Sequence, residues 1–121
     1  MTSAMLVRPL IALILTLSAP ILALASETFL AELEDLPLAP GLTEAAGGLL
    51  FDSADGRIVE ATASGAIGAE QVRQFYEQTL RQLGWQSVGP LQFRRDNEIL
   101  KIGLDEKAKS LTVHFNLTPT H

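Results

Sequence analysis

Cysteine is absent from this chain of 121 residues, and its absence excludes several classes of protein. Without thiols there is no disulfide framework, no thiolate metal ligand, no catalytic cysteine and no cysteine for lipid modification. Histidine is scarce as well, because His114 and the final residue, His121, are the only two. No H-x-H, H-E-x-x-H or EF-hand spacing occurs, so the sequence predicts neither a metal site nor a cofactor.

Basic residues are also few, since nine Lys and Arg stand against 14 Asp and Glu and give a net charge of −5. The densest basic spot is Arg94-Arg95, and the acidic neighbours Asp96 and Glu98 favour a solvated strand end over a phosphate contact. An anionic domain repels phosphate backbones, and no basic stripe offsets this charge. The composition therefore argues against nucleic acid as a partner.

The N-terminus carries a long run without charge. Arg8 is followed by Pro9–Ala25, which ends in an A-x-A site just before Ser26. This pattern is typical of a secretory signal peptide and predicts cleavage between Ala25 and Ser26. The protein is then exported, periplasmic or secreted, with no membrane contact after cleavage. An uncleaved membrane anchor is the alternative, although Pro20 would interrupt a spanning helix.

The rest of the chain is long enough for one domain. We expect a signal peptide over residues 1–25, a leader over residues 26–41 and a single α+β domain over residues 42–121. Within the leader, Glu27–Asp35 has the pattern of a short amphipathic helix, or else forms a mobile segment. The Pro-rich stretch that follows reads as an extended connector.

The clearest periodicity predicts a helix over residues 69–83. Its apolar or half-apolar positions recur at helical spacing and are Val72, Phe75, Tyr76, Thr79, Leu80 and Leu83. Gly84 stands where a left-handed residue would end the helix.

Strand patterns flank this helix. Before it, residues 48–52 and 57–64 are joined by a turn that contains Asp55-Gly56, which predicts a hairpin. After it, four apolar or alternating runs are separated by short turns and cover residues 85–88, 91–95, 99–105 and 110–117. Short turns indicate antiparallel neighbours, so we predict an α+β fold of order ββαβββ(β) with the helix packed on one face of the sheet.

The helix also carries a longer motif that ends in Gly84-Trp85. It resembles the V-x-x-F-Y-x-x-x-L-x-x-x-G-W signature of small exported alphaproteobacterial-type proteins and lipoproteins of uncharacterised function, and the similarity extends over residues 35 to 118. The matching positions are Val72, Phe75, Tyr76, Leu80, Gly84 and Trp85. The resemblance implies no chemistry, and each motif residue has a structural explanation: Phe75 and Leu80 in the core, Gly84 as a cap and Trp85 sealing the helix end. The lipoprotein members carry a modified cysteine that this chain lacks.

The sheet face away from the helix is the predicted binding surface. By alternation from the apolar positions it presents Gln92, Arg94, Lys101, Thr112, His114 and Asn116. We interpret the chain as a non-enzymatic interaction module for a periplasmic or envelope protein, acting through this open face or an exposed sheet edge. Two alternatives stay open: a small-ligand carrier with a cleft between helix and sheet, and an enzyme whose dispersed site includes His114. The sequence leaves the oligomeric state undetermined.

Overall fold

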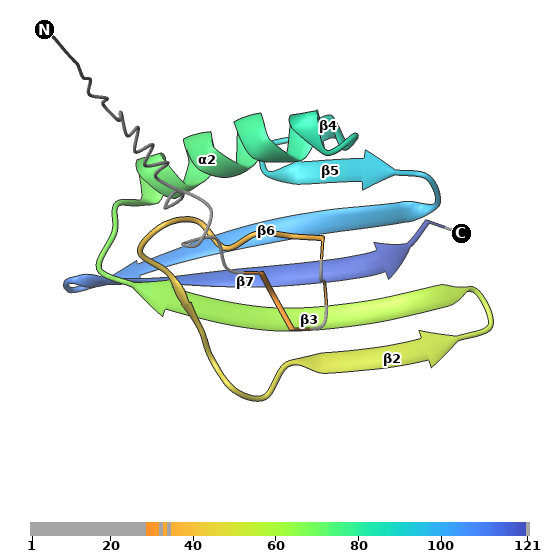
Figure 1. Cartoon of the computed structure of the whole chain (residues 1–121), viewed down its shortest axis with the longest axis horizontal. Coiled ribbons are helices and arrows are strands. Elements are labelled where there is room, and N and C mark those ends of the chain that lie inside the picture. Colours follow the sequence, from red (N-terminus) through yellow and green to blue (C-terminus); the bar gives the residue numbers. More distant parts are fainter. Residues whose placement is uncertain (1–28, 32, 34, 121) are drawn as a thin grey trace, which may run out of the picture.

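The structure is a computed structural model that describes residues 29–31, 33 and 35–120. The predicted signal peptide and its cleavage site lie outside these residues. The one helix among these described residues, α2 (Ala69–Gln82), packs on an antiparallel sheet, as Figure 1 shows. The strands are β1 (Thr43–Glu44), β2 (Leu49–Ser53), β3 (Gly56–Gly65), β4 (Gln86–Gly89), β5 (Gln92–Arg95), β6 (Glu98–Lys107) and β7 (Ser110–Pro119). The predicted α+β class and the order of strands around the helix are confirmed, with the short β1 as an addition.

The strand order in the sheet is β1-β3-β7-β6-β5-β4, and β2 also pairs with β3. Strands β4 to β7 form the expected meander, while β3 pairs with β7, the last strand of the chain. β2 and β1 share the other side of β3, because β2 pairs with its first half, up to Glu60, and β1 with Ala63 and Ser64. The two ends of the sheet are therefore β4 on one side and β1 with β2 on the other.

Alternation along the three long strands places one row of apolar side chains on the helix side of the sheet. The buried members of β3, β6 and β7 are Val59, Ala61, Ala63, Leu100, Ile102, Leu111, Val113, Phe115 and Leu117. These residues form one core with the buried side chains of the helix. At the far end of this face Arg57 Nε donates to Glu98 Oε2 at 2.7 Å, and that hydrogen bond raises the pKa of Arg57.

Helix α2 begins and ends as its sequence predicts. Val72, Tyr76 and Leu80 are fully buried against the sheet. Gly84 adopts a φ of 93°, and its N–H donates to the Arg81 carbonyl oxygen at 3.2 Å. The Trp85 N–H reaches back to the Leu80 carbonyl oxygen at 2.9 Å, which completes a Schellman cap. The buried Trp85 ring then closes the helix end, as expected.

Phe75 departs from the expectation for the motif, because it is only half-buried. It lies one position before Tyr76, so it points to the flank of the helix rather than into the sheet. Its ring packs edge-to-face on Tyr76 with 4.9 Å between centroids. The core position is taken by Tyr76 itself, whose ring also contacts Phe115 at 5.5 Å.

The segment before β1 differs most from expectation. The helix predicted for Glu27–Asp35 is wrong for the described residues, none of which is helical. Phe29 instead forms an isolated bridge with Pro37, and the Leu30 N–H donates to the Leu36 carbonyl oxygen. This N-terminal segment (the described residues of 29–42) packs on the helix side of the sheet. Its buried residues are Leu30, Leu33, Leu36, Pro37, Leu38, Ala39 and Leu42.

Tyr76 holds the N-terminal segment in place. The Ala39 N–H donates to the Tyr76 hydroxyl oxygen at 3.0 Å, and the hydroxyl donates to the Pro37 carbonyl oxygen at 2.8 Å. Burial raises the pKa of Tyr76, although the Ala39 hydrogen bond opposes the rise. The hydrophobic core thus extends N-terminal to residue 42, where the predicted domain was to begin.

Close backbone packing fixes the same segment at its far end. A Cβ placed on Gly65 would lie 2.0 Å from the Gly41 carbonyl oxygen, so only glycine fits at the end of β3.

In the hairpin between β2 and β3, Gly56 takes a φ of 139° while Asp55 keeps a negative φ.

Candidate functional site

The six predicted binding residues all lie on the face of the sheet opposite α2, here called the outer face. Strand register places Gln92 opposite Lys101 and Lys101 opposite Asn116, so these three form one row across β5, β6 and β7. Arg94 is next to this row on β5, and His114 and Thr112 follow on β7. Gln92, Arg94, Lys101 and His114 are exposed, and Thr112 and Asn116 are half-buried. No described contact tests whether they bind anything.

Charge is unevenly divided over the outer face. Arg94 and Lys101 lie on β5 and β6, whereas Glu60 lies on β3 and accepts a hydrogen bond from Asn116 Nδ2 at 3.4 Å. Beyond Glu60 the row reaches Leu49 on β2. Along this one row of the outer face, the side chains therefore change from the basic Lys101 to the acidic Glu60 and then to the apolar Leu49.

His114 has no acidic side chain directly opposite it on the neighbouring strands of this face. Its direct neighbours across the strands are Thr62 on β3 and Gly103 on β6. In the part of the chain that the structure describes, no group of three or more His, Asp or Glu side chains is gathered closely enough to hold a metal ion. Neither of these direct neighbours provides a carboxylate that could orient the imidazole.

Arg95, the second residue of the basic pair, is half-buried and makes its contacts within the protein. Its guanidinium stacks over the Trp85 ring at 4.4 Å, and its Nη1 donates to the Leu83 carbonyl oxygen at 3.2 Å. Nη2 donates to Asp35 Oδ2 at 2.7 Å. Burial alone would raise the pKa of Asp35, but the hydrogen bond and charge of Arg95 outweigh it and lower that pKa. Arg95 thus connects the helix end, β5 and the N-terminal segment.

The sequence interpretation included an exposed sheet edge but did not identify the strand, and the most unusual surface is the edge strand β2. All five residues of β2 are exposed. Leu49, Leu50 and Phe51 keep 51%, 50% and 57% of their surface accessible. The signal was present in the sequence as three consecutive large apolar residues beside a hairpin turn, but such a run is also typical of a buried strand.

The position of β2 explains this exposure. Figure 1 shows β2 at the edge of the sheet farthest from α2, beyond the reach of the helix. Leu49 and Phe51 pair with Glu60 and Ile58 and so belong to the outer face, while Leu50 pairs with Val59 on the helix side. Both faces of this edge are therefore uncovered.

A groove lies beside the helix rather than between the helix and the sheet. A groove of about 320 Å³ separates α2 from the N-terminal segment. Its lining contains no charged side chain and consists of Ala39, Pro40, Ile67, Gln71, Gln74, Phe75 and Gln78. The three glutamines recur at helical spacing along the exposed flank of α2, where Phe75 is also placed. The groove is an amide-lined trough, different from the predicted cleft between helix and sheet.

A search against protein-family models finds no match, and searches of curated proteins and of solved structures find no significant match. Among the described residues, no helix has both the length and the apolar content needed to cross a membrane.

Proposed function

We propose that this chain is a non-enzymatic interaction module, exported from the cytoplasm, that binds another periplasmic or envelope protein through the outer face and the β2 edge of its sheet. The observation that carries the proposal is the exposure of Leu49, Leu50 and Phe51 on an edge strand. Large contiguous apolar patches are rare on small soluble domains and mark sites of association. Edge strands also offer unpaired backbone groups that a second chain can use.

The surroundings of this patch support a protein partner. Interfaces of this kind combine an apolar centre with a polar rim. Here Leu49 continues into the row of Glu60, Asn116, Lys101 and Gln92 on the outer face, and Phe51 lies beside it opposite Ile58. A partner that covers β2 would therefore also meet the polar residues predicted from the sequence.

Site-specific crosslinking tests this proposal. A photoreactive phenylalanine analogue is placed at Phe51 or at Val88 of the full chain, in the cells that make the protein. Val88 is the matched control because it is 52% exposed on β4, at the opposite edge. We expect a discrete adduct from position 51 that disappears when Leu50→Lys is added, and no such adduct from position 88. No adduct from position 51, or equal adducts from positions 51 and 88, would contradict the proposal.

The groove beside α2 supports a second candidate, a carrier of a small neutral ligand. Its volume of about 320 Å³ is at the lower end of what small-molecule sites occupy. Amides can donate and accept at once, and Phe75 adds an apolar surface. A ligand-observed NMR screen with Gln74→Trp, which would fill the groove, distinguishes this candidate. Ligands that bind the native chain but not the variant would support it, and equal binding would contradict it.

A further inference from the structure

Resting on the proposed interaction role, we propose what the β2 edge binds: an extended segment of a partner protein in which consecutive large apolar residues are flanked by basic residues. The segment adds to the sheet beside β2 as its next strand. In this complex the outer face adds contacts to the partner, but the β2 edge determines which segment binds.

The two edges of the sheet differ in a way that selects β2. Natural edges are blunted by bulges, prolines, lysines or short strands. At the opposite edge, β4 has only four residues, its register shifts between Ser87 and Gly89, and Pro90 follows. β2 keeps regular register with β3 along all five of its residues and contains neither proline nor lysine. The unprotected edge is thus the one that also exposes three apolar side chains.

The apolar part of the partner follows from the pleat of β2. A strand paired to β2 would face Leu49 and Phe51 on the outer side and Leu50 on the helix side, since side chains alternate. Three consecutive residues of the partner therefore meet apolar side chains. Cross-strand pairs of this kind are the unit of sheet stabilisation.

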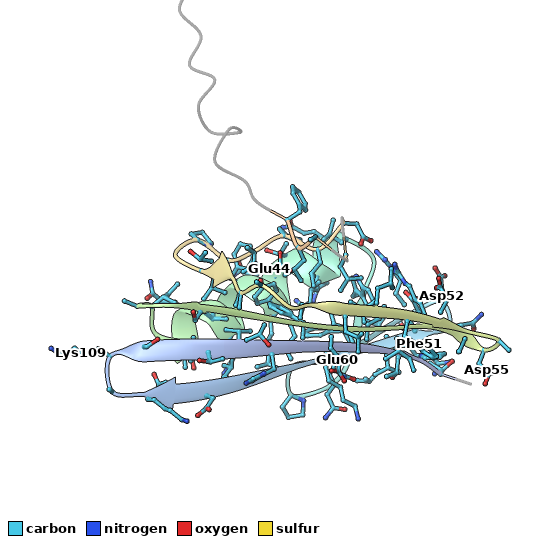
Figure 2. All side chains as sticks on the ribbon, turned by 90° about the horizontal axis from the view of Figure 1, so that it is seen from below. Glu44, Phe51, Asp52, Asp55, Glu60 and Lys109 are labelled. Atoms are coloured by element: carbon cyan, nitrogen blue, oxygen red, sulfur yellow. The ribbon has the colours of Figure 1, made fainter. Side chains whose placement is uncertain are left out.

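The basic part follows from charge at one end of β2. Asp52 and Asp55 form no salt bridge within the described residues, and both lie where β2 turns into β3. Arg57 lies opposite Asp52 across the strands and interacts with its charge, but its hydrogen bonds go to Glu98, and Asp55 is left without a cation in salt-bridge contact among the described residues. Figure 2 shows Asp52 and Asp55 at one end of the molecule and Lys109 at the other, so Lys109 does not neutralise them. A Lys or Arg next to the apolar triplet, before it in an antiparallel strand or after it in a parallel one, would pair with these carboxylates.

The same charges disfavour a second copy of this chain as the occupant. Two β2 strands would bring two further carboxylates to the contact, between molecules that each carry a net charge of −5. Five residues per strand also bury little area compared with the roughly 1,200 Å² of a standard interface. A cationic partner gains from the charge that a second copy would have to overcome.

Synthetic peptides provide the test. The probe is a fluorescein-labelled peptide, Lys-Ile-Phe-Val-Lys-Lys, titrated with the mature chain in fluorescence anisotropy at physiological salt. Its comparison is the same peptide with every Lys replaced by Glu. Two further versions are N-methylated at alternate residues in either phase, which blocks strand pairing on one side without changing charge. We expect saturable binding of the basic peptide, at least tenfold weaker binding of the Glu peptide, and a similar loss for one methylated phase only.

Charge-matched variants separate the edge from the overall charge. Asp52→Asn with Asp55→Asn removes two charges at the edge, and Glu77→Gln with Asp105→Asn removes two charges elsewhere. We expect the first pair of substitutions to weaken binding of the basic peptide about threefold to tenfold, and the second pair to weaken it less than twofold.

Three results would overturn the inference: equal weakening by both pairs of variants, equal binding of both methylated phases, or concentration-dependent dimers of the free chain that Leu50→Lys abolishes. If position 51 still crosslinks to a protein while the peptides fail, the interaction role stands and only the chemistry assigned to the partner falls.

Discussion

Tyr76→Phe should loosen the N-terminal segment from the rest of the protein. The substitution keeps the buried ring and removes only the hydroxyl that joins the Pro37 carbonyl and the Ala39 N–H, at 2.8 and 3.0 Å. Both backbone groups are buried and would lose their partner. Such a loss costs about 1–3 kcal/mol of unfolding free energy, and we expect about 2 kcal/mol here. For a domain of this size that is a fall in Tm of roughly 8–16 °C.

Urea unfolding followed by the fluorescence of Trp85, the only tryptophan, measures this change. Limited proteolysis adds a local readout, because residues 30–42 should be cut faster in the variant. Thr79→Val is the control, since it removes a half-buried hydroxyl of the same helix that does not bridge the N-terminal segment. A loss below about 0.5 kcal/mol for Tyr76→Phe, within the range of ordinary surface substitutions, would refute this reasoning.

The same tyrosine makes stability depend on alkaline pH. Burial raises the pKa of Tyr76, so the unfolded chain loses the phenol proton near pH 10 while the folded chain still holds it. The contribution of Tyr76 to the unfolding free energy should therefore be constant below about pH 10 and then fall by about 1.4 kcal/mol per pH unit. Tyr76 is the only tyrosine, so Tyr76→Phe should remove this fall. An identical alkaline profile in both proteins would contradict the assignment.

Three further substitutions test other parts of the structure. Gly65→Ala should cost at least about 2 kcal/mol in thermal unfolding, because its Cβ would collide with the Gly41 carbonyl oxygen. Asp35→Asn should cost about 0.2–1 kcal/mol at neutral pH and nothing once the pH falls below the lowered pKa of Asp35, since the pair with Arg95 is present only above it. Phe51→Thr should change stability by less than about 0.5 kcal/mol while raising the solubility limit, because the ring contributes to the surface rather than to the core.

Each of these has a matched control. Gly103→Ala introduces a Cβ at ordinary contact distance and should change stability by less than about 1 kcal/mol, so equal costs at both glycines would contradict the steric argument. Arg95→Gln should abolish the acid dependence that Asp35→Asn abolishes. Val88→Thr replaces a similarly exposed side chain on β4. An equal rise in the solubility limit for this variant would contradict the prediction that the exposed side chains of β2 in particular limit solubility.

Much of the sheet could be predicted because its signals are local. The helix follows from the spacing of Val72, Tyr76 and Leu80, and its end follows from Gly84. Short turns imply the antiparallel meander after the helix. The two-residue period of β6 and β7 separates the helix side from the outer face, so the six outer-face positions were placed correctly without a structure. Whether they bind a partner stays a prediction.

Sequence by itself determined the elements and their two faces, because propensity, periodicity and caps act within a few residues of chain. Only the tertiary structure decided that β3 lies beside β7, that Tyr76 anchors Pro37 and Ala39 from 37 to 39 residues away, and that the N-terminal segment joins the core instead of forming a helix. It also decided that Leu49, Leu50 and Phe51 are exposed, since an apolar run has the same sequence pattern whether or not another element covers it. These outcomes depend on which distant surfaces meet, and a local pattern does not contain that information.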